Sequence, residues 1–153
     1  RNYTMILPDF KAFPRVGRIL GVDWGLRRIG IAVSDPKREF VFVRDPIVVP
    51  RTGAEHAQLV WQAAQSEGVT GIVIGLPLYP DRGESDTTKM VREFANELAA
   101  KTDLPICFIE ENLTSYTAQE NMGRVRVREL KERLDSESAC VILENAIAMI
   151  NRG

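Results

Sequence analysis

Residues 18–35 read RILGVDWGLRRIGIAVSD, a stretch in which two apolar runs flank a turn that contains glycine. The runs 19–22 and 29–33 are rich in β-branched residues and have the length of buried strands. This stretch predicts a β-hairpin inside a sheet, with the carboxylate of Asp23 where the first strand ends. A carboxylate in that position requires a positive partner, which an arginine, a helix N-terminus or a metal ion can supply.

The composition is that of an ordinary globular protein, with 44% hydrophobic and 27% charged residues in a chain of 153. This length predicts one domain with a substantial core. The apolar runs are too short to span a bilayer, and the first residues lack the pattern of a signal peptide. The two cysteines match no metal or redox spacing, which favours buried, reduced thiols in a cytoplasmic protein. The net charge of −1 means that nucleic-acid binding needs a local basic patch.

Strand and helix patterns alternate along the chain after the hairpin. We expect an N-terminal extension over residues 1–16 and a single domain over residues 17–153. The patterns predict strands at 39–43, 71–75 and 104–109, a loop at 76–83, and helices at 53–66, 86–101, about 115–122 and 139–150. Thr52 and Glu55 form a capping-box signature for the first of these helices. The fold class is therefore α/β, with a mixed five-stranded sheet of three antiparallel strands followed by parallel strands, and helices on both faces.

Two further acids occupy positions that suit a site shared with Asp23. Glu111 follows the last predicted strand, and Asp135 precedes the final predicted helix. In parallel sheets, sites gather beyond the carboxyl ends of the strands. Three carboxylates from separate elements suit Mg²⁺ or Mn²⁺. Two such ions about 4 Å apart can activate a water and stabilise the leaving oxygen of a phosphodiester.

Each acid also has a simpler interpretation. Asp23 can pair with Arg27 or Arg28 across its own turn, and Glu111 can be a surface acid in a loop. Asp135 can cap the final helix. Spacing alone leaves these interpretations open beside the metal site.

Four motifs in order give the chain a resemblance to a known family. They are GVDWG with RIGIAVSD within residues 21–35, IVIGLPL at 72–78, ENLTS at 111–115 and DSESACVIL at 135–143. Together they resemble the YqgF family, also called RuvX, of RNase H-like nucleases. The resemblance implies an RNase H-like fold, with Asp23, Glu111 and Asp135 as the catalytic acidic triad and the ligands of a divalent metal. It also implies processing of the 5′ end of pre-16S ribosomal RNA in the cytoplasm, or resolution of Holliday junctions.

The chain departs from the family pattern in two places. Asn112 stands where the family usually has an arginine beside the metal-binding acid, so a cation that would contact phosphate is missing. The link before Asp135, residues 124–133, is rich in arginine rather than in lysine and glycine.

Basic and glycine-containing segments near the acids are candidates for contact with substrate phosphates. Five of the ten residues in 124–133 are basic, and a second basic patch near the hairpin comprises Arg27, Arg28, Lys37 and Arg38. Backbone N–H groups after the strand at 71–75 are a further candidate. The predicted substrate-binding residues are Arg27, Arg28, Gly75, Pro77, Thr114, Arg124, Arg126 and Arg128. A solvated loop and an ordinary turn after a strand are the simpler alternatives.

Two aromatic residues are assigned structural roles. Trp24 follows Asp23 directly, so alternation directs it to the opposite face of the sheet, where it packs in the core. His56, the only histidine, is expected to face solvent in the first turn of a helix. The lack of a second histidine argues against a zinc site.

Together these observations predict a metal-dependent nuclease, a hydrolase that cleaves phosphodiester bonds in precursor rRNA with Mg²⁺ or Mn²⁺. Branched DNA is the alternative substrate, for which a resolvase needs two active sites. A non-catalytic RNA-binding factor in ribosome assembly is a second class. An ATPase-like module is a third, although 153 residues provide only one of its two lobes. The expected partner is nucleic acid rather than a membrane, and the expected state is a monomer or a homodimer.

Overall fold

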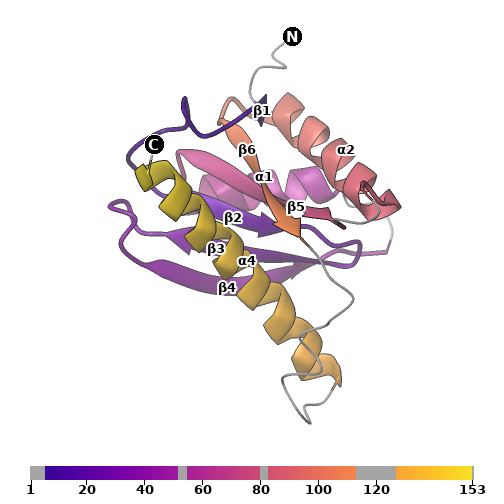
Figure 1. Ribbon diagram of the computed structural model, residues 1–153. Coiled ribbons are helices and arrows are strands. Elements are labelled where there is room, and N and C mark those ends of the chain that lie inside the picture. The colour runs from indigo at the N-terminus through magenta and orange to yellow at the C-terminus, as the bar shows by residue number, and fades with distance from the viewer. Residues whose placement is uncertain (1–5, 52–54, 80–82, 113–126, 153) are drawn as a thin grey trace.

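The computed structural model describes residues 6–51, 55–79, 83–112 and 127–152, with the backbone alone for Asn112 and residues 127–136. The strands are β1 (Ile6–Leu7), β2 (Ile19–Asp23), β3 (Arg28–Ser34), β4 (Val41–Val48), β5 (Gly71–Leu78) and β6 (Ile106–Asn112). The helices are α1 (His56–Glu67), α2 (Asp86–Lys101) and α4 (Val127–Arg152). The strands form one sheet in the order β1-β6-β5-β2-β3-β4 (Figure 1). No helix in these described ranges is both long enough and apolar enough to cross a bilayer.

The predicted hairpin lies at the centre of this sheet. β2 pairs antiparallel with β3 and parallel with β5, and β3 pairs antiparallel with β4. β6 extends the parallel half beside β5. The predicted mixed α/β sheet is confirmed, but it has six strands rather than five. The sixth is β1, because Ile6 and Leu7 of the expected N-terminal extension pair with Ile106 and Cys107 of β6.

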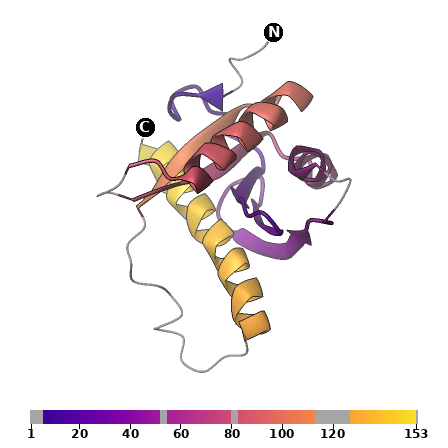
Figure 2. The same cartoon turned by 90° about the vertical axis from the view of Figure 1, so that its right-hand side faces the viewer.

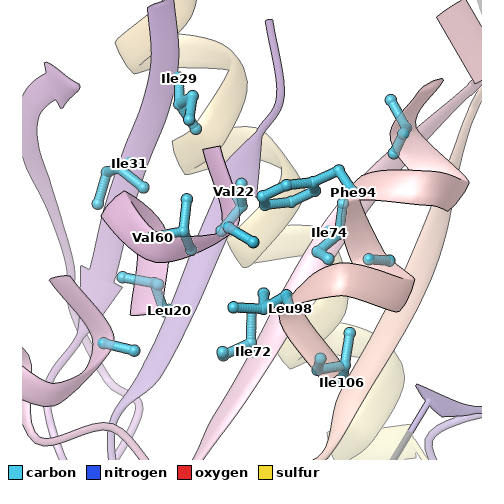
Figure 3. Close-up of a cluster of buried hydrophobic side chains, with 14 of the residues drawn as sticks. Leu20, Val22, Ile29, Ile31, Val60, Ile72, Ile74, Phe94, Leu98 and Ile106 are labelled. Carbon is cyan, nitrogen blue, oxygen red and sulfur yellow. The ribbon is translucent and has the colours of Figure 1, made fainter. Parts of the chain in front are cut away.

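Helices cover both faces of the sheet, as predicted. α4 crosses one face, while α1 and α2 cover the other (Figures 1 and 2). Under α1 and α2, aliphatic side chains of the central strands pack around Phe94 and Leu98 (Figure 3). Under α4, Ile142 packs in a second cluster that includes Phe10 and Phe13 from the N-terminal segment. The central strands are buried on both faces, which explains their near-continuous apolar runs.

Two strands run through prolines at which the sequence predicts an interruption. β4 continues through Pro46 to Val48. It is an edge strand with a register irregularity in its pairing to β3, and both features accommodate a residue without an N–H. β5 continues through Pro77, so the predicted loop at 76–83 begins too early. Pro77 is tolerated because β2 has ended at this point and needs no ladder hydrogen bond from it.

The first two helices differ in how well their starts are predicted. α1 begins at His56, which makes Glu55 its N-cap residue, and no side chain caps it. The predicted capping box of Thr52 and Glu55 is therefore wrong, and Thr52 itself lies outside the described residues. α2 has the predicted bounds and starts with a capping box formed by Ser85 and Thr88.

The final helix is much longer than predicted. α4 spans Val127–Arg152 rather than residues 139–150, and its N-terminal part extends beyond the sheet in Figure 1. Asp135 therefore lies inside the helix, and its predicted role as an N-cap is wrong, because a cap residue precedes the first turn. Residues 127–133 are likewise helical rather than a solvated loop. The helix predicted at about 115–122 lies outside the described residues.

Candidate active site

Asp23 and Glu111 lie at the same edge of the sheet. β2, β5 and β6 run parallel to one another, so their carboxyl ends meet at one edge. Asp23 is the last residue of β2, and Glu111 is the last but one of β6. The fold thus brings together two of the three acids that the sequence nominates.

The two acids also face the same side of the sheet, the side covered by α4. Along a strand, side chains alternate between the two faces. Gly21 faces α4, since a Cβ built on it would lie 2.9 Å from Cβ of Leu143, and Asp23 is two residues further along β2. Ile109 packs in the cluster under α4, and Glu111 is two residues further along β6.

Gly75 of β5 provides the space between the two acids. It pairs with Ile109 of β6 and directly follows Ile74, the last β5 residue in register with β2. A Cβ on Gly75 would lie 2.8 Å from Oε1 of Glu111 and 2.5 Å from Cδ1 of Ile142. The carboxyl of Glu111 therefore lies over β5, the strand between its own and that of Asp23, in space left by the missing side chain.

The surroundings of Glu111 are unfavourable for its charge. Burial raises the pKa of its carboxyl above the ordinary value. Among the described residues, no side chain or backbone group donates a hydrogen bond to it or pairs with it. A half-buried carboxylate without a partner is unfavourable as an anion, and a bound cation would offset this cost.

The third predicted acid, Asp135, lies on α4 four residues before Ala139. α4 crosses β2 closely at this level, since a Cβ on Gly21 would lie 3.0 Å from the carbonyl oxygen of Ala139. The side chain of Asp135 lies outside the description. Among the side chains that are described, no three His, Cys, Asp or Glu gather as a metal site would require. Asp23 and Glu111 thus form two members of a candidate site rather than a complete set.

The predicted basic patch near the hairpin is divided between two ends of β3. Arg28 begins β3 and has the same parity as Gly30, the partner of Asp23, so it faces the α4 side of the sheet beside that acid. Arg27 is exposed in the turn. Arg38 lies beyond the other end of β3 and is buried, so the expectation that it joins a phosphate-binding patch with Arg27 and Arg28 is wrong. Its guanidinium instead donates hydrogen bonds to the backbone carbonyls of Pro14, Val16 and Gly17.

The remaining predicted substrate contacts fall into two groups. Gly75 is buried beneath Glu111 and Ile142, and Thr88 donates a 2.6 Å hydrogen bond to the carbonyl of Pro77. Packing thus accounts for both residues without a phosphate. Thr114, Arg124 and Arg126 lie outside the described residues, and for Arg128 only the helical backbone is described.

The hairpin turn is held from the opposite face of the sheet. Trp24 packs against the core under α1 and α2, as predicted, and its ring lies 5.2 Å from that of His56 and 6.5 Å from that of Phe94. His56 does not simply face solvent. Its Nε2 lies 2.9 Å from the carbonyl oxygen of Leu26, so this nitrogen carries the proton and donates. The sequence offers no signal for this contact, because 30 residues separate its partners.

The cysteines match the prediction of free thiols. No disulfide joins them, and Cys107 is buried while Cys140 is half-buried. Burial raises the pKa of the Cys107 thiol to about 12. Such a thiol is unreactive at neutral pH and belongs to the core.

Comparison with known proteins gives consistent matches along most of the chain. A family model described as "RuvX: Holliday junction resolvase" matches residues 17–149. A relative from Maridesulfovibrio salexigens is 36% identical over 133 residues, which cover 86% of this chain and 98% of the relative. One from Rhodopirellula baltica is 36% identical over 136 residues, which cover 87% and 78%. Both carry the name "Putative pre-16S rRNA nuclease".

Among solved structures, Thermus thermophilus RuvC in complex with Holliday junction substrate is 11% identical, with a TM-score of 0.46 over 88% of this chain and 90% of that one.

Proposed function

Since the chain belongs to the RuvX family, a family with an RNase H-like fold, we propose that it is a metal-dependent nuclease that processes the 5′ end of pre-16S rRNA in the cytoplasm. The names of its curated relatives suggest this class of substrate. The carboxyl edge of the sheet carries Asp23 and Glu111, whose carboxylates are suited to binding a divalent metal ion.

The position of Glu111 is the observation that carries this proposal. Its carboxyl lies over Gly75, on the strand next to the one that ends in Asp23, and burial raises its pKa. A divalent cation held by Glu111 and Asp23 would offset the cost of placing the Glu111 charge in this half-buried position. Carboxylate oxygens are the ligands that Mg²⁺ and Mn²⁺ prefer, so this donor set fits either ion. When bound, the ion supplies a Lewis acid that polarises the scissile phosphodiester.

Asp135 is our candidate for the third metal ligand. α4 approaches β2 at Ala139, and Asp135 precedes Ala139 by about one helical turn. Residues four apart lie on the same face of a helix, which supports a position for Asp135 on the side of α4 that meets the sheet.

The basic residues would bind and orient the nucleic acid. Arg28 lies on the same side of the sheet as Asp23, and Arg27 is exposed beside it, so both are suited to neutralise substrate phosphates near the acids. A phosphate-binding role is also proposed, from the sequence alone, for Thr114, Arg124, Arg126 and Arg128. Asn112 cannot supply the positive charge that the family usually has at this position, and we propose that Arg28 compensates for it.

A cleavage panel tests the proposal. The substrates are precursor rRNA, an unstructured RNA and a four-way DNA junction, each with Mg²⁺, with Mn²⁺ and with EDTA. We expect metal-dependent cleavage of the precursor that Asp23→Asn abolishes. The matched control is Asp103→Asn, an exposed aspartate just before β6 at the opposite edge of the sheet, which should cleave like the wild type. Cleavage that persists in EDTA or in Asp23→Asn would refute the proposal.

Junction resolution is the second candidate, and the description of the matching family favours it. Resolving a four-way junction requires two active sites that act on two strands. Symmetric cuts in the junction substrate, together with a dimer in solution, would support this activity. A strictly monomeric protein that cleaves only RNA would exclude it.

A further inference from the structure

The turn of the β2–β3 hairpin, residues 24–27, exposes an apolar side chain directly before a basic one. Leu26 is 55% exposed and belongs to neither buried cluster. Arg27, next in the chain, is also exposed, and Arg28 begins β3. A leucine at the tip of a short turn gains little from folding, since most of its surface stays in water. Its exposed side chain is therefore available for contact with a partner outside the chain.

The backbone of this turn is anchored on both sides of Leu26. The carbonyl of Leu26 accepts the hydrogen bond from Nε2 of His56, at 2.9 Å. The carbonyl of Arg27 accepts a hydrogen bond from the N–H of Val49, at 2.8 Å. Trp24 fixes the first residue of the turn by packing on His56 and on the core. These contacts hold the backbone of the tip in place, so little backbone freedom is lost when it meets a partner.

The tip lies close to the candidate active site. Leu26 follows Asp23 by three residues, which limits the distance between their Cα atoms to about 11 Å. Residues of the turn are therefore within one or two nucleotides of a phosphodiester held at Asp23.

We propose that Leu26 is a strand-separating contact that inserts between bases where a duplex ends or branches, while Arg27 contacts the adjoining phosphate. The proposal rests on the proposed nuclease function and specifies its substrate as nucleic acid with a boundary between paired and unpaired strands. Apolar side chains are suited to this role because the flat faces of bases are apolar, and inserted leucines unstack base steps in many complexes. Arg27, the next residue, supplies electrostatic attraction to the phosphate backbone of the nucleic acid.

The test uses an RNA hairpin with a single-stranded tail and the same strand unpaired, with Mn²⁺. For each protein we measure the ratio of the cleavage rates on the two substrates. Leu26→Ala should lower this ratio at least tenfold relative to the wild type. Val16→Ala is the matched control, since Val16 is 75% exposed before the opposite end of β2, and it should leave the ratio unchanged.

A second measurement needs no cleavage. A 2-aminopurine base is placed at the duplex boundary, and its fluorescence is followed on binding in EDTA. Wild-type protein should raise the fluorescence by unstacking the base, and Leu26→Ala should not. His56→Phe keeps an aromatic ring beside Trp24 but removes the donor to the carbonyl of Leu26, so a fluorescence rise between the two is expected.

The outcomes separate this inference from the proposed function. If Leu26→Ala is folded by thermal unfolding and gives the wild-type ratio or the wild-type fluorescence rise, the strand-separating contact is refuted. If the wild type cleaves neither substrate but still raises the fluorescence in a Leu26-dependent manner, the nuclease function fails while the contact stands.

Discussion

Charged side chains beside the two ends of β2 differ in how well the chain satisfies their hydrogen bonds. Near the start of β2, the buried guanidinium of Arg38 donates three hydrogen bonds of 2.6–3.1 Å, to the carbonyls of Pro14, Val16 and Gly17. The carboxylate of Asp35 accepts backbone N–H groups of Lys37, Glu39 and Phe40 at 2.7–3.2 Å. Beside the carboxyl end of β2, Glu111 of β6 is half-buried with a raised pKa and receives no hydrogen bond from the described part of the chain.

This difference separates charged groups that stabilise the fold, Arg38 and Asp35, from Glu111, whose charge we propose is neutralised by a bound metal ion. A charged group whose hydrogen bonds are satisfied within the chain stabilises the fold and offers nothing to a ligand. A buried carboxyl without a partner costs stability, and perturbed groups of this kind concentrate at functional sites. Charged residues beside the two ends of β2 should therefore respond to substitution in opposite ways.

The largest contrast should come from one substitution made at both ends, Asp23→Asn and Asp35→Asn. The first should reduce nuclease activity by roughly 10³-fold or more, since it removes a proposed metal ligand worth several kcal/mol in the transition state. Asp35→Asn should lower the melting temperature and keep the activity.

The pH dependence checks the role of Asp35 in that comparison. The backbone N–H of Phe40 is the first cause that lowers the pKa of Asp35. The stabilisation by its carboxylate is therefore complete above the unfolded pKa and is lost as the pH falls through the lowered value. The melting temperatures of wild type and Asp35→Asn should converge in acid. Loss of activity in a folded Asp35→Asn protein would contradict the division between the two ends.

The next largest effect should follow Arg38→Ala. The substitution leaves three backbone carbonyls without their charged donor, and we expect a loss of about 2–4 kcal/mol in the free energy of unfolding by urea. The specific activity of the folded fraction should remain. Arg38→Lys, which keeps the charge but lacks the planar fork, should recover only part of the stability. Full recovery would show that charge alone matters at this position.

Substitution of two glycines beneath α4, Gly75 and Gly21, separates the effect of packing from the effect on the candidate metal site. Gly75→Ala and Gly21→Ala should each cost about 1–3 kcal/mol, because the added Cβ meets Ile142 or Leu143 of α4 within 3 Å. Only the Cβ at position 75 also meets Oε1 of Glu111, at 2.8 Å. Gly75→Ala should therefore raise the Mn²⁺ concentration needed for half-maximal cleavage, and Gly21→Ala should not. Equal metal dependence in both variants would argue against a role for Glu111 in metal binding.

The smallest effect should be a gain in stability on substitution of Glu111 by glutamine. The raised pKa of Glu111 means that the folded state favours its neutral form, so the carboxyl destabilises the metal-free fold above that pKa. Glu111→Gln should therefore be more stable than wild type at pH 7 in EDTA. This gain should disappear as the pH falls below the unfolded value of 4.5, as urea unfolding at several pH values will measure. A loss of stability at pH 7 would mean that the carboxylate has a partner.

Local patterns were sufficient for much of the fold and for the choice of acids. The hairpin around Asp23, the bounds of α2 and the mixed order of strands all follow from short-range periodicity and turn residues. Errors arose where neighbours outside the segment decide the outcome. β5 continues through Pro77 because β2 has already ended beside it, and Ile6 and Leu7 form a strand because the edge of β6 is open to them.

By itself, the sequence determined that Asp23 and Glu111 lie where two apolar strands come to an end, because apolar runs and their polar ends are local properties. Only the tertiary structure decided that these two ends meet on the side of the sheet under α4, with Gly75 between them. It also decided that Arg38 belongs to the fold, and that His56 holds the turn at Leu26. The physical reason is that burial, hydrogen-bond satisfaction and close packing depend on residues far apart in the chain, which periodicity cannot register.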